Sequence, residues 1–285
     1  MGRKYSHLIK EKDMKGERIE VHDADKIKEA VNKFIGKEKG EGDSEYHFTR
    51  YKSWTRCHKY FLDIKRKKYE YLNDDEISRA QLELGYYLAS WGMYRGSSFI
   101  LQYDCSIFEK IIPIILDKAY DDLWDLPFEK INSKEKLESI KGSLVEIRNK
   151  INDKLKAYRD YYNQKKNELP DDEKNDEQDK NISQTLVTKI LLGTLCCIPA
   201  YDTYFCNAIR GQESTKGKFN DFYDDEKIVN LLNLISKNPI FEKLRKEYHP
   251  KYPLMKIVDM AYFTIGYDQA LAEKSNKKEK IKKEQ

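Results

Sequence analysis

The feature that most constrains the fold of this chain is a run of apolar residues that recurs at steps of three and four. The run consists of Leu137, Ile140, Leu144, Ile147, Ile151, Leu155 and Tyr158. This spacing places all of these side chains on one face of an α-helix, with lysine and glutamate on the rest of its surface. A helix of roughly 30 residues that begins near Ser133 would be about 45 Å long. The pattern predicts one arm of an antiparallel helix pair, or a projecting helical hairpin.

The composition favours helices in the rest of the chain as well. Charged residues make up 36% of the 285 residues and the hydrophobic class 39%, whereas only 13 are glycine and 7 are proline. A β-sandwich needs more turn-forming residues than this, and no stretch has the pattern of a strand. We therefore predict an all-α protein, a multi-helix globular body with a long projecting helix and an acidic linker.

Shifts in composition along the chain predict five parts. Residues 1–43 are an N-terminal arm with a short helix, 44–132 the first part of the helical body, 133–182 the long helix and acidic linker, 183–270 the second part of the body, and 271–285 a lysine-rich tail. The linker sequence ELPDDEKNDEQDKN is almost free of apolar residues, which is typical of a solvated segment. We expect the tail to fray.

The net charge of +4 is too small for tight nucleic-acid binding by overall electrostatics. A polyanionic partner must therefore bind to a local patch. The strongest basic segment is a helix predicted over 46–71. Its candidate contacts to a nucleic-acid backbone are Arg50, Lys52, Arg56 and Lys59.

The cysteines and the N-terminal sequence indicate a reducing cytoplasm. The five cysteines are odd in number, and no secretory signal precedes them. No apolar run approaches the roughly 20 residues that cross a bilayer. The histidines lack the spacing of a zinc motif, and the chain has no phosphate-binding loop, dinucleotide fingerprint or nucleophile elbow. We therefore expect no metal, no cofactor and no membrane partner.

An unusual acid stands just after the apolar stretch 188–200. Asp202 follows Pro199 among apolar residues, where a charge is costly, so we expect it to have a task. The sequence of apolar helix, proline turn and aspartate resembles an element of the helix-hairpin-helix DNA glycosylase superfamily. That resemblance implies that Asp202 begins a helix, stabilises an oxocarbenium-like transition state and orients water or an attacking amine.

The chain departs from that family before the apolar helix. The family has a glycine-rich hairpin there, whereas this chain has Asn181-Ile182-Ser183-Gln184-Thr185-Leu186. Lys189 does not match the position of the family's nucleophilic lysine, so we assign it only to substrate binding. In the alternative interpretation, Pro199 ends one core helix and Asp202 simply caps the next.

A second candidate site follows the helix predicted to end near Trp91. Arg95 stands between two glycines, close to aromatic and hydroxyl side chains, and such an arginine can hold a phosphate or stack on a base. The candidate substrate-binding residues are Arg95, Trp91, Tyr94, Ser97, Tyr201 and Lys189. We expect a pocket where 91–98 meets 199–204. Alternatively, two core helices cross there and Arg95 pairs with Asp202 or Asp259.

Together these features favour a nucleic-acid- or nucleotide-directed protein with a glycosylase-like hydrolase activity on DNA, in which Asp202 is the catalytic residue and acts as electrostatic stabiliser or base. The first alternative is a non-catalytic interaction protein. In that case a partner, or a second copy of the chain, would bind an exposed apolar stripe from Leu144 to Leu155 on the long helix.

The second alternative is a helical ribonuclease or toxin. Arg245 and His249 resemble the Arg-(four to six residues)-His signature of the helical HEPN ribonucleases, although only three residues separate them here. This hypothesis requires the two side chains to face each other across a cleft. Lys256 and Asp259, one turn apart in a predicted helix, are expected to form a surface salt bridge.

Overall fold

The computed structural model describes residues 11–12, 18–19, 24–36, 50–67, 69–96, 98–167, 182–210 and 221–284. Helices dominate these residues, and the fold is all-α, as predicted. The described strands are β1 (Glu11–Lys12) and β2 (Arg18–Ile19), a two-residue antiparallel pair with Glu11 opposite Ile19. The predicted acidic linker, 168–181, lies outside the described residues.

The chain folds into two compact units, and each is assembled from segments that are far apart in sequence. Unit 1 comprises Met1–Glu45, Pro127–Leu137 and Pro199–Gln285. Unit 2 comprises Tyr46–Leu126 and Glu138–Ile198. Neither unit is therefore one continuous stretch of sequence.

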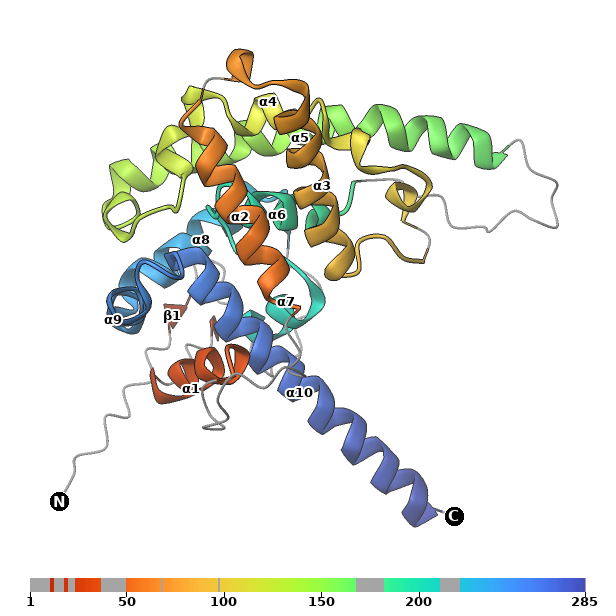
Figure 1. Ribbon diagram of the computed structural model, residues 1–285. Coiled ribbons are helices and arrows are strands. Elements are labelled where there is room, and N and C mark those ends of the chain that lie inside the picture. Colours follow the sequence, from red (N-terminus) through yellow and green to blue (C-terminus); the bar gives the residue numbers. More distant parts are fainter. Residues whose placement is uncertain are drawn as a thin grey trace. The chain divides into compact units, whose positions relative to one another are not determined.

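Unit 1 is built around its last helix. Its helices are α1 (Ala24–Phe34), η6 (Phe128–Lys130), α7 (Thr203–Arg210), α8 (Asp225–Lys237), α9 (Pro239–Tyr248) and α10 (Leu254–Glu284), and the first turn of α5 (Lys134–Asn167) also belongs to it. Helices α1 and α7 both pack along α10 (Figure 1). Nearly all residues of the first turns of α10 are buried, from Leu254 to Tyr262. This segment is therefore the centre of the unit's core.

The lysine-rich end of the chain is part of the helix α10, and its fraying stays a prediction. Figure 1 shows α10 as one continuous helix up to Glu284. Lysine, glutamate and alanine are good helix formers, so this polar sequence can extend a helix whose first turns are fixed in a core.

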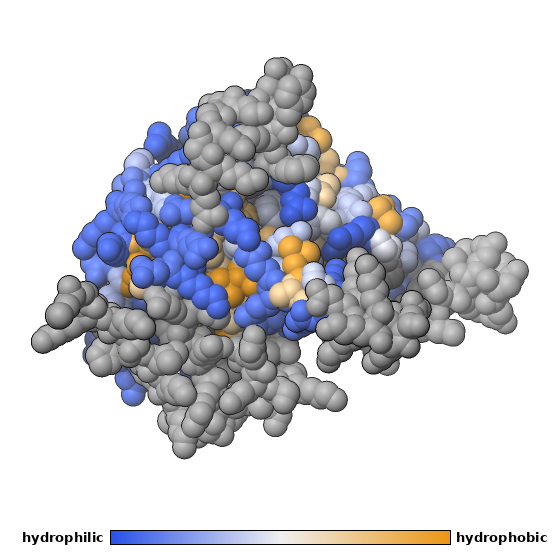
Figure 2. Space-filling view, turned by 90° about the horizontal axis from the view of Figure 1, so that it is seen from below, coloured by the Kyte–Doolittle hydropathy of each residue, from blue (hydrophilic) through white to orange (hydrophobic). Residues whose placement is uncertain are grey.

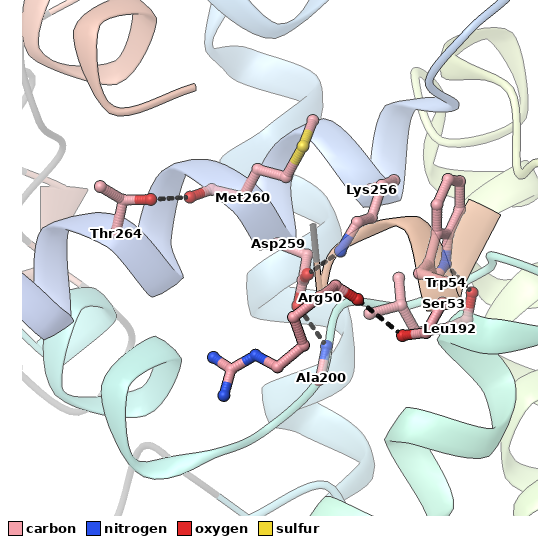
Figure 3. Close-up of polar contacts among 9 residues, drawn as sticks. All are labelled: Arg50, Ser53, Trp54, Leu192, Ala200, Lys256, Asp259, Met260 and Thr264. Atoms are coloured by element: carbon pink, nitrogen blue, oxygen red, sulfur yellow. Dashed lines mark hydrogen bonds and ion pairs between the residues drawn. The ribbon is translucent and has the colours of Figure 1, made fainter. Parts of the chain in front are cut away.

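Unit 2 contains α2 (Lys52–Lys65) and α3 (Asp74–Ser90), which lie side by side (Figure 1). Its other helices are η2 (Tyr69–Tyr71), η3 (Phe99–Gln102), η4 (Cys105–Phe108), α4 (Ile112–Ile115), η5 (Lys118–Leu123), α6 (Gln184–Gly193) and the greater part of α5. Helix α3 begins with a capping box, in which Asn73 and Glu76 each accept a backbone N–H from the other. Trp54, on α2, is anchored by an indole N–H that donates to Leu192 O at 2.8 Å (Figure 3).

Helix α5 confirms the helix predicted from the apolar spacing, but it leaves no exposed stripe. Leu144, Ile147, Ile151 and Leu155 are all completely buried in unit 2. The apolar face of α5, on which the interaction-protein hypothesis expects a partner to bind, is therefore covered by other residues of the same chain. On the face of the molecule drawn in Figure 2, hydrophilic residues predominate and the visible hydrophobic ones form small separate patches.

Candidate functional site

The end of α3 in unit 2 brings together several of the residues expected to bind substrate. Trp91 is the C-cap residue of α3, and Gly92 follows it with φ +76°. Gly96 also has a positive φ, +60°. This left-handed backbone is easy for glycine and strained for other residues, so the two glycines end the helix and reverse the chain.

Three cationic side chains lie at the end of α3, and two of them lie over the ring of Trp91. The guanidinium carbon of Arg50 is 4.5 Å from the ring centroid, and Lys189 Nζ is 5.1 Å from it. The guanidinium of Arg95 folds back over Gly92, where a Cβ atom would lie only 3.1–3.2 Å from it. Arg50 and Arg95 are exposed, whereas Lys189 is buried. The sequence analysis placed Arg50 in a different group, on the predicted basic helix.

The charge at this helix end is clearly positive. A helix C-terminus carries about half a negative charge, which one cation compensates. Neither Arg50 nor Arg95 forms an ion pair with another residue that the structure describes. Because Asp202 and Asp259 belong to unit 1, the alternative in which Arg95 pairs with one of them stays a prediction. The exposed charges are therefore available to an anion from solution.

The other candidates at this helix end differ in accessibility. Tyr94 is half-buried, and loss of solvent raises its pKa to about 12. Its hydroxyl has no hydrogen-bond partner among the described residues. Ser97 lies outside the described residues.

The remaining predicted backbone contacts lie on α2. Lys52 and Lys59 are exposed, while Arg56 donates to Glu83 at 3.0 Å. Because Glu83 is buried and holds this guanidinium, Arg56 is less available to a phosphate than the two exposed lysines.

In unit 1, Asp202 caps α7. Asp202 Oδ1 accepts the backbone N–H of Phe205 at 3.0 Å, one turn into the helix. The local order of apolar helix, proline turn, aspartate and helix therefore agrees with the resemblance, and it also agrees with the alternative in which Asp202 is only a cap. A catalytic role for Asp202 stays a prediction.

Tyr201, beside Asp202, is a core residue. Its ring lies 5.4 Å from Phe205 and 5.4 Å from Phe222, measured between centroids, and its side chain is buried. Burial raises the pKa of its hydroxyl. Because Tyr201 belongs to unit 1 and Trp91 to unit 2, the pocket expected between 91–98 and 199–204 stays a prediction.

The turn before Asp202 is held by an ion pair that we expected on the surface. Lys256 Nζ donates to Asp259 Oδ2 at 2.7 Å, and Asp259 Oδ1 accepts the N–H of Ala200 at 3.1 Å (Figure 3). Both side chains are buried, with 2% and 8% exposure, so the surface prediction is wrong. All faces of the first turns of α10 are buried. The spacing of Lys256 and Asp259 predicts that they pair but does not predict that the pair is buried.

Unit 2 also contains a buried histidine, His58, that no motif in the sequence indicates. His58 Nδ1 lies 2.7 Å from Thr194 O, and Nε2 lies 2.8 Å from Asp125 Oδ1. A carbonyl only accepts, so Nδ1 is the donor to Thr194. Asp125 has φ +50°, a strained value for a residue with a side chain. Both ring nitrogens are in contact with the protein, which favours a structural role.

The arrangement required of a helical ribonuclease is not observed. Arg245 and His249 lie one turn apart at the end of α9, and His249 N–H donates to Arg245 O at 2.9 Å. The Arg245 guanidinium is bonded to Glu129 at 2.9 Å. The two side chains thus do not face each other across a cleft.

Other kinds of site are not found in the part of the chain that the structure describes. It holds no group of three or more His, Cys, Asp or Glu side chains that could bind a metal ion. No helix in it combines the length and apolar character needed to cross a membrane. All five cysteines are described, and all are free thiols.

Compared with protein-family models, with curated proteins and with solved structures, the chain matches none. Its function therefore has to be inferred from the side chains of the two units.

Proposed function

We propose that this chain is a nucleic-acid- or nucleotide-directed protein that binds phosphate groups at the Trp91 end of α3. The observation that carries the proposal is the cluster of cations at this helix end. Arg50 and Lys189 lie over the Trp91 ring, Arg95 lies over Gly92, and both arginines are exposed. Guanidinium groups bind phosphate oxygens in a bidentate manner. Lys189 is buried, with its amine against the Trp91 ring, so it adds positive charge beneath the exposed arginines.

The site suits recognition of a phosphate backbone more than a single tight ligand. Its exposed cations lie at a helix end, and exposed Lys52 and Lys59 add charge on α2. Such contacts give affinity that depends on salt and little on sequence. We place the protein in the cytoplasm, a proposal supported by its five free thiols.

The test is the anisotropy of labelled single-stranded and duplex DNA and RNA, titrated with the wild-type chain between about 50 and 200 mM salt. We expect the Arg50→Gln/Arg95→Gln double variant to bind more weakly and to lower the log–log salt slope by about 2, one for each phosphate contact.

The control is Lys118→Gln/Lys134→Gln, which removes the same charge from exposed positions elsewhere. If both double variants bind as the wild type does, or lose equal affinity, the Trp91 end of α3 is not the phosphate site.

A second proposed activity is a glycosylase-like hydrolase reaction on DNA that uses Asp202. It is supported by the position of Asp202 at the N-terminus of α7, directly after the proline turn. The helix dipole favours the ionised carboxylate there, and a carboxylate stabilises a cationic transition state. A half-buried carboxylate also keeps some access to solvent.

Abasic sites in labelled DNA, revealed by alkali, test this activity. We expect them with the wild-type chain and not with Asp202→Asn, which keeps an oxygen to cap α7. Equal yields from both proteins, or none from a folded wild type, would exclude Asp202 as the catalytic carboxylate.

A further inference from the structure

A second surface of unit 2 combines aromatic rings with lysines. A groove of about 550 Å³ lies beside the C-terminal half of α5. It is lined by Tyr103, Lys110, Asp153, Lys154, Ala157, Tyr158 and Tyr161. None of these residues belongs to the cluster around Trp91, so the groove is a separate feature.

Two of the three tyrosines hold each other in place. The Tyr103 hydroxyl donates to the backbone carbonyl of Tyr158 at 2.8 Å, and the two rings meet edge to face with centroids 5.3 Å apart. Burial raises the pKa of Tyr103, so it stays a neutral donor at physiological pH. These two rings are already fixed in position, so a ligand that binds against them does not have to pay the entropy cost of ordering them.

The third tyrosine offers a ring to solvent. Tyr161 is 56% exposed and lies about one turn beyond Tyr158 on the same helix. The amine of Lys165 is 5.9 Å from its ring centroid. An exposed aromatic ring beside a cation is the arrangement on which nucleic-acid bases stack.

The charges of the groove favour an anion. Lys110 and Lys154 are exposed, and neither forms an ion pair with a described residue. Among the lining residues that the structure describes, Asp153 is the single acid. The described part of the lining contains no leucine, isoleucine, valine or methionine, which are the aliphatic anchors that seat an amphipathic helix.

We propose that this groove binds unpaired nucleotides of a single-stranded nucleic acid, with a base stacked on Tyr161 and neighbouring phosphates on Lys110 and Lys154. This proposal rests on the proposed function, since it names the strand state that the protein prefers. Bases in a duplex are stacked on each other and cannot reach a tyrosine face, so the groove selects single strands.

The experiment measures the binding of the full chain to a labelled oligothymidylate of about 12 nucleotides, within the span of one site. A duplex of equal length is measured in parallel. We expect Tyr161→Ala to weaken single-strand binding roughly 5- to 150-fold, the value of one stacked base, and to leave duplex binding unchanged.

Two variants separate stacking from other effects. Tyr161→Phe keeps the ring and should bind the oligothymidylate as the wild type does. Tyr71→Ala removes an exposed tyrosine (69%) outside the groove and should also have no effect. Circular dichroism confirms that each variant folds.

The outcomes distinguish this inference from the proposed function. If the wild type binds both probes and Tyr161→Ala binds both equally well, the groove is not the site and the proposed function stands. If the wild type binds neither probe, both fail. Competition by polyglutamate as strong as by unlabelled oligothymidylate would also overturn the inference, because the groove would then select charge and not bases.

Discussion

Single residues decide stability most clearly where charge is buried, as in the Lys256–Asp259 pair. The energy of such a pair depends on its hydrogen bonds, because the loss of hydration is large and is recovered only if both partners are satisfied. Here both oxygens of Asp259 are satisfied, since one accepts from Lys256 and the other from Ala200. The pair therefore fixes the start of α10 to the turn before Asp202.

We expect Lys256→Met to lower the free energy of unfolding by about 3–5 kcal/mol, because it leaves the Asp259 carboxylate buried without a cation. The double variant Lys256→Met/Asp259→Asn should be less destabilised than this single variant, since the amide oxygen still accepts from Ala200. Urea unfolding of the two single variants and the double variant measures the coupling. If the losses of unfolding free energy in the two single variants add up to that of the double variant, the two side chains are not coupled.

A pH effect is expected at the start of α3. Lys67 Nζ and the backbone N–H of Asn73 donate to the Glu76 carboxylate and lower its pKa. A carboxyl with a lower pKa in the folded state stabilises that state above its unfolded pKa, and this contribution is lost as the pH falls through the folded value.

Glu76→Gln should therefore be less stable than the wild type at neutral pH, with the difference disappearing in acid below the ordinary glutamate pKa of about 4.3. Urea unfolding at several pH values measures it. Glu109→Gln, a change at an exposed carboxylate in unit 2, is the control. A difference that does not depend on pH would show that the charge of Glu76 is not responsible.

At the scale of whole elements, close packing between helices depends on particular glycines. A Cβ atom on Gly266 in α10 would lie 1.9 Å from the carbonyl oxygen of Tyr204 in α7, which is impossible without separating the helices. Gly142 in α5 has no such neighbour within 4 Å. The same substitution should therefore have opposite effects at the two positions.

Gly266→Ala should destabilise the protein by about 1–3 kcal/mol or more, because the clash is with backbone and not with a side chain that can move. Gly142→Ala should stabilise it by about 0.5–1 kcal/mol through helix propensity. Thermal unfolding of both variants tests the pair. Equal shifts of Tm would mean that α7 and α10 do not approach so closely.

The elements also show what the sequence can and cannot predict. Helix α5 was predictable because burial of one face leaves a periodic pattern of apolar residues in the sequence. The burial of Lys256 was not predictable. An acid three residues further along a helix is typical of a surface ion pair, and the contact that places Asp259 in the core comes from Ala200, 59 residues away in the sequence. The contact of His58 with Asp125 has no spacing signal either.

At the scale of the whole molecule, the two units differ in how their segments are distributed along the sequence. Residues 46–198 contain all of unit 2, together with Pro127–Leu137 of unit 1. Unit 1 in contrast needs both ends of the chain. Helix α1 lies against α10, with Lys33 bonded to Asp268 at 2.7 Å and Phe34 in edge contact with Phe263.

A fragment of residues 46–198 should therefore fold alone, whereas 199–285 should not, because it lacks α1 and leaves the apolar face of α10 uncovered. Cooperative thermal unfolding, followed by near-ultraviolet circular dichroism, distinguishes them. A cooperative transition in 199–285, or none in 46–198, would contradict this division.

The two buried lysines give each unit its own chemical reporter. Of the lysines that the structure describes, Lys189 in unit 2 and Lys256 in unit 1 have buried side chains, with 4% and 2% exposure. Acylating reagents modify exposed amines quickly, so these two react only when the surrounding structure opens. Mass spectrometry of their acylation at increasing temperature thus reads the opening of each unit separately, within one intact chain and without any substitution.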